Sequence, residues 1–245
     1  MVKFYLKIEN NMLINKLFYI ITTLVLMFNM ALRIFPNIFI GAYKFHDTKV
    51  IVPIELFEYC DGYLLLLFII LLFFFLGTDF TNSMEDISLV VGGSKTNKFM
   101  LRKLISLLCI YMALYVITFT NIYTLYSKCV PNTTLIPLKE IILCSFTTNV
   151  FVIALSLFLL FLFRDIIVSV TAITAFYLIE ELLWRCRIFK NSGILGHIYR
   201  YYDYKSGALY KVKLIYIVIS VVLLFLTYLL SRRKLRFNLL TEGKE

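Results

Sequence analysis

The sequence lacks any polar segment large enough to form a soluble domain. Only 16% of its 245 residues are charged, whereas 61% are hydrophobic and 17% are aromatic, and the mean hydropathy is +0.86. Soluble globular domains are about half apolar, so this composition excludes a soluble protein and leaves no room for a soluble catalytic domain. It indicates an all-α integral membrane protein whose single transmembrane domain covers residues 1–245.

Residues that usually carry binding chemistry are also scarce. The chain has two histidines and five cysteines, and the cysteines form no C-x-x-C pair. Cys109 and Cys144 fall within apolar runs and are interpreted as core residues. A disulfide could form among Cys60, Cys129 and Cys186 on the outer side, and its connectivity cannot be deduced from the sequence.

The net charge of +10 has no soluble basic domain to carry it. We therefore assign it to contact with anionic lipid headgroups of the bilayer and expect no nucleic-acid partner.

Six apolar runs predict the membrane topology. A helical span needs about 20 apolar residues, and the runs predict spans at about 17–35, 59–78, 104–127, 140–163, 166–184 and 214–231. The first run is longer than a signal-peptide core and no cleavage site follows it, so we expect it to be retained. Residues 1–16 have apolar side chains at helical spacing and predict an amphipathic surface helix. Arg164 and Asp165 alone separate two runs, which predicts a tight turn.

Six spans place both termini on one side of the membrane. The basic residues divide almost evenly between the two sides, because seven of them lie between Arg185 and Lys213. Early loops and the basic tail weigh more in the positive-inside rule. We therefore expect a multi-pass protein of the cell membrane with cytoplasmic termini.

The polar segment from Thr78 to Lys103 differs from an ordinary loop, although an ordinary cytoplasmic loop is the alternative. Ser83 can cap a short helix, and acidic residues then occupy its first turn, where the helix dipole favours anions. Gly92 and Gly93 end this helix, and basic residues lead into the next apolar run. We interpret the segment as a docking helix for a soluble partner. Its predicted docking residues are Ser83, Met84, Glu85, Asp86, Ile87, Leu89, Val90, Val91 and Lys95.

The stretch Gly93-Ser94-Lys95-Thr96 partly matches a phosphate-binding loop. It lacks the earlier glycine, the Gly-Lys pair and the preceding strand of that motif. We therefore expect this chain to bind no nucleotide.

A second motif, Glu180-Glu181-Leu-Leu-Trp-Arg185, resembles the E-E-x-x-x-R signature of CAAX-protease and bacteriocin-processing intramembrane proteases. That family also uses an F-x-x-x-H motif, whereas His46 lies upstream and His197 follows Gly193-Ile-Leu-Gly. One alternative is an acidic pair at a helix end that pairs with Arg185 or Arg187, one turn further on. Carboxylates at membrane depth also favour a functional interpretation, and we expect Glu180, Glu181 and Arg185 to line or gate a pathway.

The overall layout resembles the permease subunit of type-2 ATP-binding-cassette exporters. Asp79 and the acidic stretch after it, Ser94-Lys95 and Lys103 match that family's coupling-helix region, whereas Ser83 and Gly93 replace its usual glycine and proline. The resemblance implies a dimer with itself or a sister permease, and re-entrant helices in the long outer segment. It also implies cytoplasmic ATPase subunits that carry the ATP and Mg, so this chain would need neither catalytic residues nor a cofactor.

The cargo is less defined. The spans read as rich in Phe, Leu and Ile and poor in buried charge, which favours a hydrophobic or amphipathic cargo such as an antimicrobial peptide, a lipid or a drug. A non-enzymatic immunity membrane protein without an ATPase is the other alternative.

Overall fold

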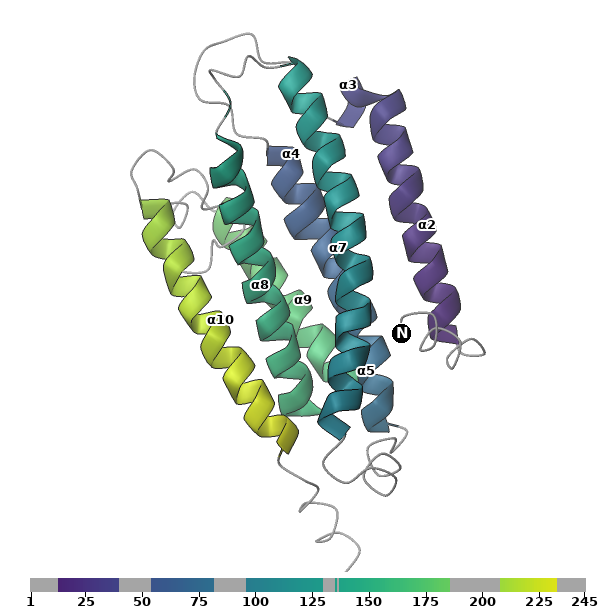
Figure 1. Cartoon of the computed structure of the whole chain (residues 1–245), viewed down its shortest axis with the longest axis vertical. Coiled ribbons are helices and arrows are strands. Elements are labelled where there is room, and N and C mark those ends of the chain that lie inside the picture. The colour runs from purple at the N-terminus through teal and green to yellow at the C-terminus, as the bar shows by residue number, and fades with distance from the viewer. Residues whose placement is uncertain are drawn as a thin grey trace, which may run out of the picture.

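The computed structural model describes residues 13–39, 54–81, 96–129, 135, 137–185 and 208–232. Within these ranges the long helices run side by side along one axis and form an elongated bundle (Figure 1). The helices are α2 (Leu13–Ile34), α3 (Pro36–Phe39), α4 (Ile54–Leu56), the π-helix η2 (Phe57–Leu64), α5 (Leu65–Thr81), α7 (Thr96–Cys129), α8 (Leu138–Phe163), α9 (Ile166–Arg185) and α10 (Ala208–Arg232).

Four stretches of these helices are long and apolar enough to cross a membrane: Glu55–Gly77, Lys103–Lys128, Leu138–Phe163 and Tyr210–Ser231. Shorter apolar helices cover Phe18–Ile34 and Ile166–Glu180. The prediction of a helical membrane protein is confirmed at this level, and the count of six spans stays a prediction.

Several helices begin earlier than the apolar runs predicted. The second apolar segment is helical from Ile54, before the expected start of its span at 59. In the same way, α7 begins at Thr96 and α10 begins at Ala208, before the expected starts at 104 and 214. The apolar runs were cut at charged residues, but charged residues with partners inside a bundle do not end a helix.

The turn between α8 and α9 has the expected form. Arg164 adopts a left-handed conformation with φ of 53°, and its N–H donates to the Leu160 carbonyl at 2.9 Å. Asp165 Oδ1 accepts a hydrogen bond from the Val168 N–H at 3.0 Å and so satisfies a free donor in the first turn of α9. Two residues therefore suffice to reverse the chain.

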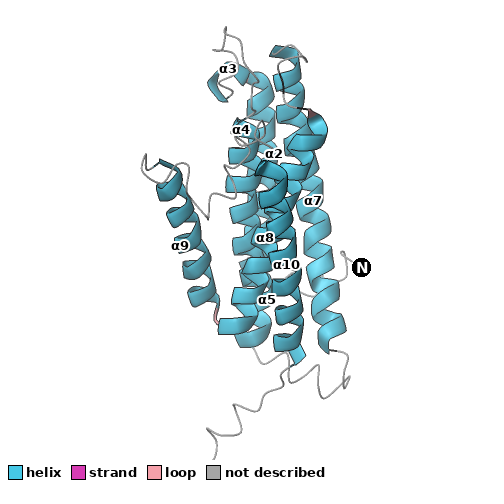
Figure 2. Ribbon diagram, turned by 90° about the vertical axis from the view of Figure 1, so that its left-hand side faces the viewer, coloured by secondary structure: helices cyan, strands magenta, loops and turns pink. Residues whose placement is uncertain are grey.

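The core of the bundle is centred on α5, whose sequence is apolar on every side. Of an apolar 18-residue window within Glu55–Gly77, 67% is buried, against 17% of the corresponding window within Tyr210–Ser231, so α5 is central and α10 peripheral. Leu65, Ile69, Leu72 and Phe73 are fully buried. A helix that is hydrophobic all round is expected to lie inside such a bundle. In Figure 2, α9 diverges from the other helices as it leaves the turn after α8.

Polar side chains join α2 to α7. Asn29 Nδ2 donates to Thr118 Oγ1 at 2.9 Å, and Asn121 Nδ2 donates to the Asn29 carbonyl at 2.9 Å. Arg33 Nε donates to Asn121 Oδ1 at 2.8 Å. Interhelical hydrogen bonds of this kind hold helices together in lipid, where the hydrophobic effect does not.

Two expectations about cysteine are wrong. Cys60 is a buried free thiol inside η2, so it takes no part in a disulfide. Cys109 is exposed on the surface of α7, whereas Cys144 is buried as expected. The side chain of Cys129 and the whole of Cys186 lie outside the described residues.

Candidate functional site

A cluster of buried polar side chains lies inside the bundle, on one face of α8. Ser145, Thr148 and Asn149 interrupt the apolar sequence of this helix at spacings of three and four residues, which puts them on the same face. All three are buried. At 1.5 Å per residue, Asn149 lies about 16 Å along the helix from its start, which is well inside the apolar stretch.

Asp61 of η2 faces these residues and is fully buried. Its Oδ1 accepts hydrogen bonds from the Ser145 hydroxyl and from Asn149 Nδ2, the latter at 2.7 Å. Its Oδ2 is also buried and has no hydrogen-bond donor in the part of the chain that the structure describes. The two bonds therefore fix the carboxylate and leave one oxygen open to a further partner.

Two tyrosines of α7 are hydrogen-bonded to the α8 side chains that contact Asp61. The Tyr111 hydroxyl donates to Asn149 Oδ1, and the Tyr115 hydroxyl is hydrogen-bonded to Ser145 Oγ. Because Ser145 donates its single proton to Asp61, Tyr115 is the donor in that pair. The chain of donors thus runs from α7 through α8 to the Asp61 carboxylate, as expected for a charged acceptor.

Lys213 of α10 brings a positive charge to the same region. It is 1% exposed, and its Nζ donates to Thr148 Oγ1 at 2.7 Å. Its ammonium group interacts electrostatically with the carboxylates of Asp61 and Glu180. Because ionisable groups are costly within a membrane and usually functional there, we regard this cluster as the candidate functional site.

A further buried carboxylate, that of Glu140, lies at the start of α8. Glu140 is in the first turn of α8, where the helix dipole stabilises a negative charge. The Tyr210 hydroxyl of α10 donates to Glu140 Oε1. The other oxygen, Oε2, is buried and meets no donor among the described residues.

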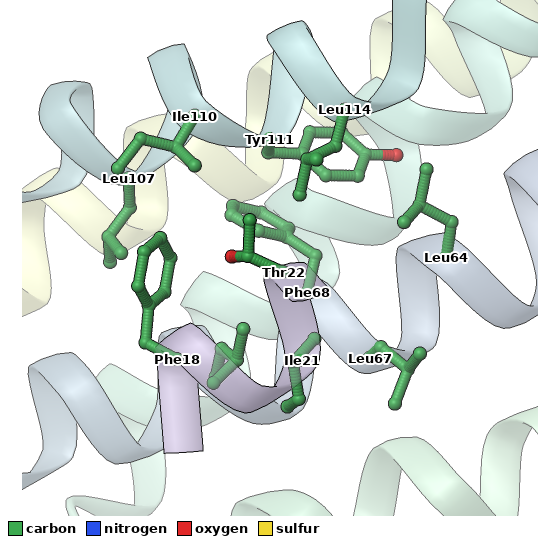
Figure 3. Close-up of a pocket in the computed structure, with 11 residues that line it drawn as sticks. Phe18, Ile21, Thr22, Leu64, Leu67, Phe68, Leu107, Ile110, Tyr111 and Leu114 are labelled. Atoms are coloured by element: carbon green, nitrogen blue, oxygen red, sulfur yellow. The ribbon is translucent and has the colours of Figure 1, made fainter. Parts of the chain in front are cut away.

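An apolar pocket adjoins the polar cluster, between α2, α5 and α7. Phe18 and Thr22 of α2 face Phe68 of α5 and Leu107 and Tyr111 of α7 (Figure 3). The ring of Tyr111 lines this pocket, while its hydroxyl belongs to the polar cluster. A larger groove of about 360 Å³ continues along the same side of the bundle, and the two share Leu64 and Leu67. The Tyr111 side chain therefore contacts both the apolar pocket and the polar cluster.

The predicted gate residues are only partly described. Glu180 is buried near the end of α9 and interacts with Lys213, and its role in a pathway stays a prediction. Glu181 and Arg185 belong to α9, but their side chains lie outside what the structure describes. His46 and His197 also lie outside it, so the protease-like hypothesis stays a prediction. The described residues hold no group of three metal-ligating side chains.

The docking segment falls outside the described residues. This applies to Ser83, Met84, Glu85, Asp86, Ile87, Leu89, Val90, Val91 and Lys95. Their assignment as a docking surface therefore stays a prediction.

Sequence reasoning missed most of the polar cluster and described the spans as poor in buried charge, which is wrong. Asp61 fell inside the predicted span at about 59–78 but was not recognised as a site residue, and Lys213 was assigned to the segment just before the last apolar run. Both lie within helices. A signal was present in α8, because polar residues at one helical face of an apolar run indicate a buried partner.

Comparisons of this chain with known protein families, with characterised proteins and with solved structures find no match.

Proposed function

We propose that this chain is the membrane-spanning subunit of an ATP-driven exporter of the ATP-binding-cassette type. In this proposal six spans cross the cell membrane, both termini are cytoplasmic, and separate ATPase subunits bind residues 79–103. The chain pairs with a second permease copy and itself performs no catalysis. The cargo moves outward when the ATPase subunits push on the docking segment.

The observation that carries the proposal is the packing of the helix ends that flank the docking segment. The end of α5, the start of α7, the turn between α8 and α9 and the end of α10 all lie at one end of the bundle (Figure 1). Close to this end the Lys103 ammonium lies 4.4 Å from the centre of the Phe75 ring, and Lys103 is 1% exposed. A buried cation over an aromatic ring is a strong contact, so α5 and α7 would move together.

A second contact joins α5 to α9 at the same end. Gly77 of α5 leaves room for Ile166, the first residue of α9, and a Cβ at position 77 would lie 2.4 Å from Ile166 Cγ1. Small residues allow helices to approach closely in membranes. A force applied between residues 82 and 95 would therefore reach α5, α7 and α9 together, which supports a mechanical role for the docking segment.

We expect changes in the docking segment to abolish recovery of an ATP-binding partner. Glu85→Arg reverses a charge, and the double change Leu89→Asp with Val90→Asp removes apolar surface, so each should disrupt a complementary partner surface. The measurement is co-purification from native cells in a mild detergent, with membrane insertion checked by protease protection.

The matched control is Lys139→Glu, a charge reversal at an exposed position at the opposite end of the bundle. It should leave recovery of the partner unchanged. Normal recovery of an ATPase with the Glu85 and Leu89/Val90 variants would reject the docking assignment. A chain that never yields an ATPase would reject the exporter proposal itself.

The gate hypothesis makes a separate prediction. The double change Glu180→Gln and Glu181→Gln removes the charge but keeps the size of both side chains, so it should lower cargo export while the ATPase still co-purifies. Export is measured as cargo released per unit of membrane-inserted protein. Unchanged export in this variant would contradict a role of the acidic pair in the pathway.

A further inference from the structure

Polar side chains line the contact between α8 and α10, which run side by side (Figure 1). Glu140, Cys144 and Thr148 follow one another at four-residue spacing on one face of α8, and Tyr210 and Lys213 lie about one turn apart on α10. The Tyr210 hydroxyl donates to Glu140 Oε1, and Lys213 Nζ donates to Thr148 Oγ1 at 2.7 Å. These five residues form a polar seam that begins near the start of both spans and extends about 12 Å along α8.

The polar seam leads to Asp61 and stops there. Lys213, at its inner end, interacts electrostatically with the Asp61 carboxylate. Further along the same two helices, buried hydroxyl groups donate to carbonyls of their own helix at 2.6 to 2.8 Å, and these belong to Ser156, Ser220 and Thr227. On the described residues of α8 and α10, polar side chains therefore lead to Asp61 from one end of the bundle only.

Groups that can take up or release a proton face Asp61 from several helices. They are Cys60 of η2, Tyr111 and Tyr115 of α7, Cys144 of α8, Tyr177 of α9 and Lys213 of α10. Thiols and phenols are ordinarily uncharged at neutral pH, whereas an ammonium group is charged. Lys213 is therefore the charge in this set, and it also interacts with Glu180 of α9.

The hydrogen bonds of Asp61 are compatible with either protonation state. Ser145 and Asn149 both donate to Oδ1, whereas Oδ2 is buried and meets no donor in the described part of the chain. A proton added to Oδ2 would break neither bond, because Oδ1 would still accept both. Burial favours the neutral form of a carboxyl group, while the two hydrogen bonds and Lys213 favour the carboxylate. The same geometry thus accommodates both forms.

We propose that Asp61 is a proton-binding site that exchanges protons with one face of the membrane along the polar seam. On binding, an O–H bond forms at Oδ2, the side chain passes from negatively charged to neutral, and a hydronium ion at the membrane surface becomes water. Lys213 keeps its charge and opposes this step. A proton needs no cavity, which agrees with the complete burial of Asp61. Carboxylates within membranes commonly serve in proton relays.

The inference goes beyond the exporter proposal and does not rest on it. Protonation is measured on the full chain without an ATPase. A failure here would leave the docking experiments unaffected, and a failure of docking would leave the proton-binding site in place.

The test is infrared spectroscopy of the full chain in phosphatidylcholine bilayers, recorded from about pH 4 to about pH 10. We expect a carboxyl C=O band that grows as the pH falls and that is missing in Asp61→Asn. Lys213→Met should raise the pH midpoint of this band by about one unit or more, because an ammonium group stabilises a nearby carboxylate. Asp165→Asn, an exposed change at the opposite end of the bundle, is the matched control and should alter neither the band nor its midpoint.

The route is tested by how fast the band responds to a sudden change of pH. Glu140→Gln keeps an oxygen that accepts from Tyr210 but cannot carry a proton, so it should slow the response by about tenfold or more with little change in the midpoint. The same control, Asp165→Asn, should leave the rate unchanged. An unchanged rate in Glu140→Gln would overturn the route along the polar seam.

The assignment to Asp61 does not depend on the folding of Asp61→Asn. In the unaltered chain, isotopic labelling of the aspartate carboxyl carbons should shift the band, whereas a band from Glu140 or Glu180 would not move. An exposed aspartate would titrate independently of Lys213. The site would be overturned by the absence of a titrating band, by a band that ignores the label or persists in Asp61→Asn, or by a midpoint that does not rise in Lys213→Met.

Discussion

Replacing Asn149 with leucine is expected to lower the free energy of unfolding by about 2–3 kcal/mol, because it leaves buried polar groups without partners. Asn149 Nδ2 donates to Asp61 Oδ1 at 2.7 Å, and the side-chain oxygen Oδ1 of Asn149 accepts from the Tyr111 hydroxyl. Leucine has a similar volume, so the loss would come from hydrogen bonds and not from a cavity. The measurement is unfolding of the purified chain in detergent, followed by circular dichroism against denaturant.

Thr147→Val is the matched control for this change. Thr147 is buried on the same helix, but its hydroxyl donates only to carbonyls of that helix, Leu143 and Cys144. Valine has the same shape, and the lost bonds are local, so we expect a cost below about 1 kcal/mol. Equal losses in the two variants would show that the interhelical network contributes no more to stability than a local bond.

Replacing Gly77 with alanine is expected to cost about 1–3 kcal/mol, because the added methyl group overpacks the contact between α5 and α9. The new Cβ would lie 2.4 Å from Ile166 Cγ1 and 3.0 Å from Ile166 Cδ1. Shortening the opposing side chain should relieve the clash. We therefore expect Gly77→Ala combined with Ile166→Ala to be less destabilised than the sum of the two single changes.

Gly62→Ala provides the comparison within the same continuous helical segment. A Cβ at position 62 would meet only the Phe57 carbonyl oxygen, at 4.0 Å, which is an ordinary contact. This variant should be neutral or slightly stabilising, since alanine is favoured over glycine in a helix by up to about 1 kcal/mol. A thermal midpoint for Gly77→Ala that equals that of Gly62→Ala would contradict the close approach of α5 and α9.

The parts of the fold that depend on local chemistry could be predicted from the sequence. The apolar runs located the helices, and the two residues between Phe163 and Ile166 left room for a tight turn only. Helix starts were predicted less well. A prediction of spans from hydropathy ends each span near a charged residue. Asp61 and Lys213 nevertheless lie within helices, because they are hydrogen-bonded to partners that are distant in sequence.

The candidate site shows the same limit. Glu180 was selected because it opens an E-E-x-x-x-R pattern and because carboxylates at membrane depth favour a functional interpretation. It is buried and interacts with Lys213. Asp61 was passed over because nothing near it in the sequence indicates that Ser145 and Asn149 face it. Their meeting depends on how η2 and α8 pack, which is a property of the folded bundle and not of either segment alone.

The π-helical form of η2 has a consequence for the rotational phase of the helix that contains it. A π-helical turn holds about one residue more than an α-helical turn, so the residues before η2 are rotated about the axis relative to those of α5. Glu55 thereby accepts a hydrogen bond from Tyr126 of α7, while Asp61 faces α8 and α5 keeps its apolar contacts. Deleting a single residue between Phe57 and Leu64 would restore a regular α-helix of nearly the same length, and it would turn either Glu55 or Asp61 away from its partner.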